Sequence, residues 1–245
     1  MKLCVINPNT TAAMTARIAQ AARAVARPGT TIVAVTPASG PVSVESHFDE
    51  AVSVIGVCDE ILRGERQGCD GYVLACFGDP GLNAARELTR APVVGIAQAA
   101  FQMAALIATR FSVVTTQART RIMAEHLLQQ YGCAHLCRRV RAAEIPVLDL
   151  ETDPDAARRR IVDEARRARD EDGIGAIVLG CAGMADLART VSDAVGLPVV
   201  DGVGAAVALA ESLVGLGLGS SKFGDLAFPP AKTFSGEFAR FSSAA

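Results

Sequence analysis

Two cysteines stand at equivalent places in the two halves of the chain. Cys76 ends the apolar run 72–75 and Cys181 ends the run 177–180, and in each copy a glycine follows two residues later and a leucine six residues later. Free cysteine has a pKa of ~8.5, which a helix N-terminus lowers, so one thiol of such a pair can serve as a thiolate base while the other remains a thiol acid. Two such groups on opposite sides of one cleft can exchange a proton at a carbon stereocentre.

The repeat extends beyond the two cysteines. Residues 90–95 (Arg-Ala-Pro-Val-Val-Gly) follow the first copy and residues 196–201 (Gly-Leu-Pro-Val-Val-Asp) follow the second, while residues 3–10 have a counterpart in residues 111–118. A single cysteine at a strand end is most often a packing residue, but a matched pair in two divergent copies favours a functional role. The cysteines without such a counterpart are expected to be structural: Cys4, Cys58, Cys69, Cys133 and Cys137.

Short apolar runs alternate with helical patterns along the chain, beginning with a strand at 3–6 and a helix at 12–27. This alternation predicts an α/β fold of two similar doubly wound parallel-sheet lobes, related by a pseudo-twofold axis, with the active site in the cleft between them. We assign residues 1–96 plus 208–245 to lobe one and residues 97–207 to lobe two. The final segment is expected to pack back across lobe one.

Three further segments carry local predictions. Asp79 followed by Pro80 has the form of a helix N-cap and a first helical residue, which would place Cys76 just ahead of a helix N-terminus. The loop 37–46 is rich in Gly, Pro and Ser, and it is as well suited to a lid or binding loop as to a plain connector. In the second half, the second strand is expected within residues 140–150, interrupted at Pro146.

Composition excludes several classes of function. The 245 residues are half hydrophobic, with a net charge of -2 and a pI near 6.0, so the chain has no electrostatic footprint for nucleic acid. No apolar run reaches the ~20 residues that span a bilayer. The N-terminus lacks the features of a signal peptide, which predicts a cytoplasmic protein with reduced thiols and a small-molecule partner. The apolar helix at 97–109 makes a homo-oligomer the expected assembly.

No metal or cofactor motif is present in the sequence. Cys133, His135 and Cys137 lack the spacing and the second ligand pair of a zinc knuckle, and we expect no metal there. His47 and His126 are isolated and are expected at the surface or at a helix cap rather than as catalytic bases. The chain contains no Ser-His-Asp, P-loop or GxGxxG arrangement after a strand.

Residues 5–10, 75–81 and 179–184 resemble the aspartate/glutamate racemase superfamily, and within it the hydantoin and allantoin racemase branch. The resemblance covers nearly the whole chain, including the loop 40–45 and the tail 221–232. It implies two cysteines that act without cofactor or metal, matching Cys76 and Cys181. It also implies substrate-binding groups in the loops after the strands: Asn7, Pro8, Asn9, Ser43, Phe77, Gly78, Asp79, Thr116, Gln117, Ala182 and Gly183.

The same resemblance points to a neutral cyclic substrate. Asn7 stands where the amino-acid racemases often have an acidic residue, and Phe77-Gly78 replaces a polar pair that holds a carboxylate. The implied activity is cofactor-independent racemisation of 5-substituted hydantoins, in which a cysteine pair exchanges the proton at C5. That proton is acidic because it lies between a carbonyl and a ring nitrogen, and backbone amides can stabilise the enolate oxygen.

Other functions remain open at this point. Within the superfamily, an amino-acid racemase, a maleate isomerase or an arylmalonate decarboxylase would share the fold, although the decarboxylases keep only one of the two cysteines. A two-lobed small-molecule binding protein without turnover is an alternative from another class, against which the thiols and the missing signal peptide argue. Ureido, aliphatic and aromatic 5-substituents are all compatible with the sequence.

Overall fold

The short apolar runs form two parallel sheets in the computed structural model, which describes residues 1–242. The strand order is β2-β1-β3-β4 in one sheet and β6-β5-β7-β8 in the other, and every pairing is parallel. The central strands β3 and β7 are buried along their whole length, which explains why their sequences lack polar alternation. The predicted α/β fold with two parallel-sheet lobes is confirmed, and the shared strand order agrees with the sequence repeat.

Helices and strands alternate through both halves of the chain. The first half contains β1 Lys2–Ile6, α1 Ala12–Val25, β2 Thr31–Val35, α2 His47–Arg66, β3 Gly71–Leu74, α3 Leu82–Leu88, β4 Val93–Gly95 and α4 Ile96–Ile107. The second half contains β5 Phe111–Thr115, η1 Ala118–Thr120, α5 Arg121–Gln130, β6 Cys137–Ala142, α6 Asp149–Thr152, α7 Pro154–Glu171, β7 Ala176–Leu179, η2 Ala182–Leu187, α8 Ala188–Val195, β8 Val199–Asp201 and α9 Gly202–Gly215. The tail carries η3 Gly224–Leu226 and η4 Gly236–Phe241.

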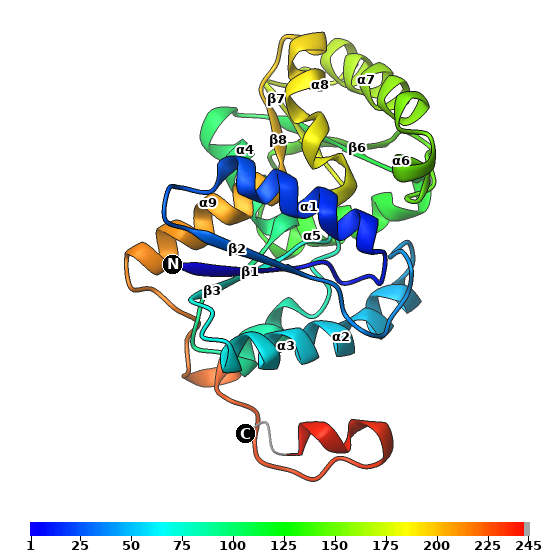
Figure 1. Ribbon diagram of the computed structural model, residues 1–245. Helices are drawn as coiled ribbons and strands as arrows, with labels where there is room; N and C mark the ends of the chain where they lie inside the picture. Colours follow the sequence, from blue (N-terminus) through cyan, green and yellow to red (C-terminus); the bar gives the residue numbers. More distant parts are fainter. Residues whose placement is uncertain (243–245) are drawn as a thin grey trace.

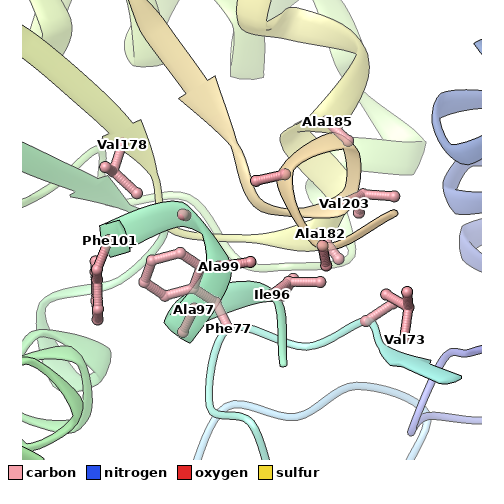
Figure 2. Packing of buried hydrophobic residues seen from close by; sticks show 14 of the residues in the cluster. Val73, Phe77, Ile96, Ala97, Ala99, Phe101, Val178, Ala182, Ala185 and Val203 are labelled. Atoms are coloured by element: carbon pink, nitrogen blue, oxygen red, sulfur yellow. The ribbon is translucent and has the colours of Figure 1, made fainter. Parts of the chain in front are cut away.

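Three helices lie between the two sheets (Figure 1). α4 follows the first sheet and packs against β7 and β8 of the second, whereas α9 follows the second sheet and packs against β3 and β4 of the first. α1 packs against α9 and against η2. Each sheet is therefore followed by a helix that packs against the other sheet. One hydrophobic cluster includes residues of both sheets, from Val73 on β3 to Val178 on β7 (Figure 2). The assignment of residues to two lobes stays a prediction.

Two predicted elements differ from the structure. Asp79 and Pro80 do not begin a helix, because α3 starts at Leu82 after Gly81, whose φ of 72° lies in the left-handed region that glycine adopts easily. The second strand of the second half is β6, Cys137–Ala142, rather than a strand within 140–150. It is fixed by pairing with β5, where Val140 lies opposite Val113, and this partner is distant in sequence.

The tail after α9 returns to the side of the first sheet. Ser220 hydrogen-bonds through its backbone N–H to the carbonyl of Arg90 at 2.9 Å. Lys222 donates to the carbonyl of Glu87 at 3.2 Å, and Arg240 forms an ion pair with Asp59 on α2 at 2.9 Å. Residues 220–240 therefore run past α3 and α2, and the end of this tail lies at the lower edge of Figure 1.

Within residues 1–242, no helix combines the length and the apolar character that crossing a bilayer requires. The expected homo-oligomer and the cytoplasmic location stay predictions.

Candidate active site

Cys76 and Cys181 line the same cavity. Each lies two residues beyond the end of a central strand, β3 at Leu74 and β7 at Leu179. The carboxyl ends of these strands face one another across a space of about 60 Å³ that both cysteines border. Parallel sheets place ligand sites at the carboxyl ends of their strands. The cavity is therefore built from both copies of the sequence repeat.

Burial raises the pKa of both thiols, contrary to the lowering that the sequence predicted. The pKa of Cys76 lies well above its usual value, because desolvation is reinforced by the nearby charges of Cys181 and Glu50. Desolvation raises the pKa of Cys181 to about 11, with Glu45 adding to the effect. The predicted helix N-terminus is missing after Cys76, since α3 begins six residues later at Leu82.

A backbone amide opposes these increases at each cysteine. The backbone amide of Gly78 lowers the pKa of Cys76, and the backbone amide of Gly183 lowers that of Cys181. The glycine two residues after each cysteine thus has the same role in both copies. These amides stabilise a thiolate when one forms.

The cavity brings together about half of the residues that the sequence predicted for the site. Besides the two cysteines, five of them line it: Asn9, Phe77, Gly78, Thr116 and Ala182. Six others do not line it: Asn7, Pro8, Ser43, Asp79, Gln117 and Gly183. The substrate-binding role of every one of these residues stays a prediction.

Asn7 lies behind Asn9 and fixes its orientation. The amide of Asn7 donates to Oδ1 of Asn9 at 2.8 Å and to Oγ1 of Thr15 at 3.0 Å, and all three side chains are buried. Asn9 in turn accepts from the backbone N–H of Thr11 at 3.0 Å. A buried amide with its hydrogen bonds satisfied holds one orientation, so this network positions a polar side chain at the cavity wall.

Ser43 and Gln117 meet at one carboxylate outside the cavity lining. Ser43 donates to Oε1 of Glu45 at 3.0 Å, and Gln117 donates to Oε2 of the same residue at 2.8 Å. The bond from Gln117 links the loop 37–46 of the first half to the loop after β5 in the second. Val44, which lies between Ser43 and Glu45 in the sequence, does line the cavity.

Phe77 both lines the cavity and fills the core. Its ring packs edge-on against Phe101 of α4, with ring centroids 5.4 Å apart and an interplanar angle of 86°. Figure 2 shows this ring between α4 and the end of the first sheet, beside Ala97 and Ala99. The residue next to Cys76 is therefore held by the helix that crosses to the second sheet.

Asp79 caps α4 instead of α3. Its Oδ1 accepts from the N–H of Ala97 at 3.1 Å and its Oδ2 from the N–H of Gln98 at 2.9 Å. The backbone of Asp79 has a φ of 44°, and its carboxylate occupies the space that a side chain on Gly95 would need. Asp79 caps a helix N-terminus as predicted, but the helix is α4 and not the α3 that follows it in the sequence.

The sequence did not identify Glu50, a carboxylate that lines the cavity. It lies in the first turn of α2, whose N-cap Ser46 accepts from the N–H of Asp49 at 3.2 Å. An acidic residue at that place is usually explained by the helix dipole, so the local sequence gave no further signal. The other lining residues that the sequence missed are Gly180 and a set of apolar or hydroxyl side chains: Met14, Val44, Ala75, Thr115, Thr120, Met123, Ala124 and Val147.

No group of three or more His, Cys, Asp or Glu side chains in residues 1–242 is arranged to hold a metal ion. Cys133 is buried beyond the end of α5, and Cys137 begins β6. The lining of the cavity also contains no Lys or Arg among the described residues. A bound carboxylate would therefore lack a cationic partner, whereas a neutral polar ring would not require one.

Comparison with known proteins supplies independent findings. The sequence profile of the Asp/Glu/Hydantoin racemase family matches residues 3–210. The chain is 47% identical over 241 residues to a hydantoin racemase of Pseudomonas sp. (strain NS671), covering 98% of this chain and 97% of that protein. It is 49% identical over 236 residues to a hydantoin racemase of Rhizobium meliloti, covering 96% and 98%. The structure of an allantoin racemase from Klebsiella pneumoniae matches with a TM-score of 0.97 and 54% identity, covering 99% of both chains.

Proposed function

The chain belongs to the Asp/Glu/Hydantoin racemase family, and from this membership we propose that it racemises 5-substituted hydantoins without a cofactor. The proposed acid and base are Cys76 and Cys181. The observation that carries this proposal is that both thiols line one cavity at the carboxyl ends of β3 and β7.

In the proposed reaction one cysteine is a thiolate and the other a thiol. The thiolate takes the C5 proton from one face of the ring, and the electron pair left at C5 delocalises into the adjacent carbonyl to form an enolate. The thiol on the other face then gives its proton to C5, so the configuration is inverted and the protonation states of the two sulfurs are exchanged. The next substrate molecule, of opposite configuration, restores them.

The reactive form of the enzyme holds one proton fewer than two thiols carry. Since burial raises the pKa of both cysteines, the thiolate is stabilised chiefly by the amides of Gly78 and Gly183. A substrate whose C–H is already acidic suits such a weakly ionised base pair. The C5 proton of a hydantoin meets that requirement better than the α proton of a free amino acid.

The lack of a cation among the described lining residues supports a hydantoin over an amino acid. Neither Lys nor Arg of the described chain borders the cavity, and its polar side chains are three threonines, one amide, the two thiols and the carboxylate of Glu50. The relatives named as hydantoin racemases, and the solved allantoin racemase, match this chain over at least 96% of its length. Together these observations favour a small neutral ring as the substrate.

A racemisation panel followed by polarimetry tests the proposal. Pure enantiomers of allantoin, 5-benzylhydantoin, 5-isopropylhydantoin, aspartate and glutamate are each incubated with the protein. We expect loss of optical rotation for one or more hydantoins and none for the amino acids. Racemisation confined to aspartate or glutamate would instead support an amino-acid racemase, and binding without any turnover would support a binding protein.

A further inference from the structure

The cavity that both cysteines line is much smaller than the groove beside it, about 60 Å³ against about 500 Å³. A ring held between the two sulfurs would occupy the smaller space. A substituent at C5 then has most room on the side of the larger space.

That space is an open groove of about 500 Å³ beside the cavity. Three residues line both: Glu50, Gly78 and Met123. Farther out, the groove carries polar side chains from three helices, His47 of α2, Asn83 of α3, and His126 and Gln130 of α5. A substituent that leaves C5 along this route passes Glu50 first.

Glu50 has a carboxylate oxygen available for a ligand. Its Oε2 lies 3.5 Å from Nδ1 of His47, which is largely exposed to solvent. Among residues 1–242 the carboxylate pairs only with His47, through Oε2, and its Oε1 occupies the place where a side chain on residue 78 would lie. The absence of a side chain at Gly78 is what lets this oxygen reach the edge of the cavity. Burial raises the pKa of Glu50, in opposition to His47, which indicates a carboxylate that gains from a hydrogen-bond donor.

We propose that Glu50 is the specificity-determining residue for the 5-substituent and that it selects substituents with N–H donors, such as a ureido group. This inference rests on the proposed function. A ureido group offers several N–H donors to Oε1, and a hydrogen bond to a charged acceptor is about twice as strong as a neutral one. An aliphatic or aromatic substituent displaces water from the carboxylate and gives it no partner, which penalises binding.

Steady-state kinetics with two variants test this selection. Glu50→Met keeps the length of the side chain and removes the acceptor, while Glu50→Gln keeps an uncharged acceptor. For allantoin we expect kcat/KM to fall about 10- to 100-fold in Glu50→Met, with a smaller fall in Glu50→Gln. For 5-isopropylhydantoin and 5-benzylhydantoin we expect no loss beyond about threefold. Asp59→Asn is the matched control on the same helix, because Asp59 pairs with Arg240 away from the cavity.

An equal loss for all three hydantoins would overturn the inference, because it would mean that Glu50 contacts the ring or supports the fold. Recognition can also be measured without turnover. Isothermal titration of allantoin into the Cys76→Ser/Cys181→Ser protein, with and without Glu50→Met, should show affinity at least about tenfold weaker with the Met substitution. That result supports the role of Glu50 even if the wild-type protein racemises nothing. Unchanged affinity, or no binding at all, overturns it.

Discussion

Tyr131 donates a hydrogen bond of 2.9 Å from its Oη to Oδ2 of Asp79. The bond joins the end of α5 to the loop that carries Cys76. Because Asp79 also caps α4, one carboxylate connects the loop after β3 to two helices that contact the second sheet. The position of Cys76 relative to Cys181 therefore depends on a residue that does not line the cavity.

The first prediction concerns the ionisation of Asp79. Burial raises its pKa to about 6, although the amides of Gln98 and Ala97 and the hydroxyl of Tyr131 lower it. The folded protein thus holds this proton at a higher pH than the unfolded chain does, so ionisation between pH ~4 and ~6 costs stability. In Asp79→Asn this cost is removed. From pH 4 to pH 7 the unfolding free energy of the wild type should fall relative to the variant, by on the order of 3 kcal/mol.

Urea unfolding of both proteins at pH 4, 5, 6 and 7 measures this difference. Tyr131→Phe is a useful companion, since it removes one donor and leaves the carboxylate in place. A wild-type minus variant difference that does not change with pH would show that Asp79 ionises at the same pH in the folded and unfolded states.

The second prediction separates the roles of the two thiols. Cys76→Ser and Cys181→Ser should each reduce racemisation by about 100-fold or more, as for the loss of an essential acid or base, and neither should unfold the protein. In heavy water each single variant should still exchange the C5 proton of one enantiomer without inversion, and the two variants should prefer opposite enantiomers. Deuterium uptake at C5, followed by NMR on each pure enantiomer, gives the answer.

Cys58→Ser is the control for that experiment, because Cys58 lies on α2 and does not line the cavity. It should retain full activity. If either Cys76→Ser or Cys181→Ser interconverts the enantiomers at nearly the wild-type rate, that cysteine is a packing residue and the two-base mechanism fails.

A third prediction follows from the raised thiol pKa values. With the pKa of Cys181 near 11 and that of Cys76 also raised, the thiolate fraction is small at neutral pH. It should increase about tenfold per pH unit below the pKa, and so should the rate of inactivation by iodoacetamide between pH 7 and 9. Substrate should protect against the reagent. An alkylation rate that is already constant above pH 7 would mean that one thiol is ionised in the resting enzyme.

A fourth prediction is that activity does not depend on a metal. Prolonged treatment with EDTA followed by desalting should leave the racemisation rate unchanged. The control is iodoacetamide, which should abolish activity in the same preparation. Activity that disappears with EDTA and returns with zinc would contradict a mechanism based on thiols alone and direct attention to Cys133, His135 and Cys137.

The fifth prediction concerns a buried ion pair in the second half. Arg141 bonds to Asp172 at 2.6 Å and to Glu164 at 3.0 Å, and both Arg141 and Asp172 are almost fully buried. Arg141→Met removes the nearest cation from buried Asp172 and leaves it with Ser112 at 2.8 Å and Arg139 at 3.8 Å. This loss should reduce the unfolding free energy by about 3–5 kcal/mol. Asp172→Asn in the same chain should recover part of that loss. Denaturation curves for the single and double variants test this, and equal stability of all proteins would contradict it.

The sequence alone predicted the fold, which is confirmed, and it predicted that Cys76 and Cys181 border one cleft. This was possible because the necessary signals are local: an apolar run without alternation marks a strand that is buried on both faces, and the Cys-x-Gly pattern recurs at the end of two such runs. The repeat then implied two similar sheets, and the strand order confirms them.

Asp79 and Glu50 show what local patterns leave undetermined. The pair Asp79-Pro80 satisfies the rule for a helix N-cap, yet its carboxylate binds the amides of α4, 18 and 19 residues later, because β4 brings that helix N-terminus beside the loop. From the local sequence, Glu50 is explained by its interaction with the dipole of α2. It reaches the cavity because Gly78 has no side chain to occupy the same space.

The pKa values of the thiols were also decided by the tertiary structure. A local rule lowers the pKa of a cysteine ahead of a helix, but desolvation raises that of Cys76 and Cys181. The charges that add to the effect include Glu50 and Asp79 at Cys76, and Glu45 and Glu151 at Cys181. Sequence periodicity specifies which face of an element is buried. Which segments then meet, and how much water they exclude from a given sulfur or carboxylate, depends on packing between residues that are far apart in the chain.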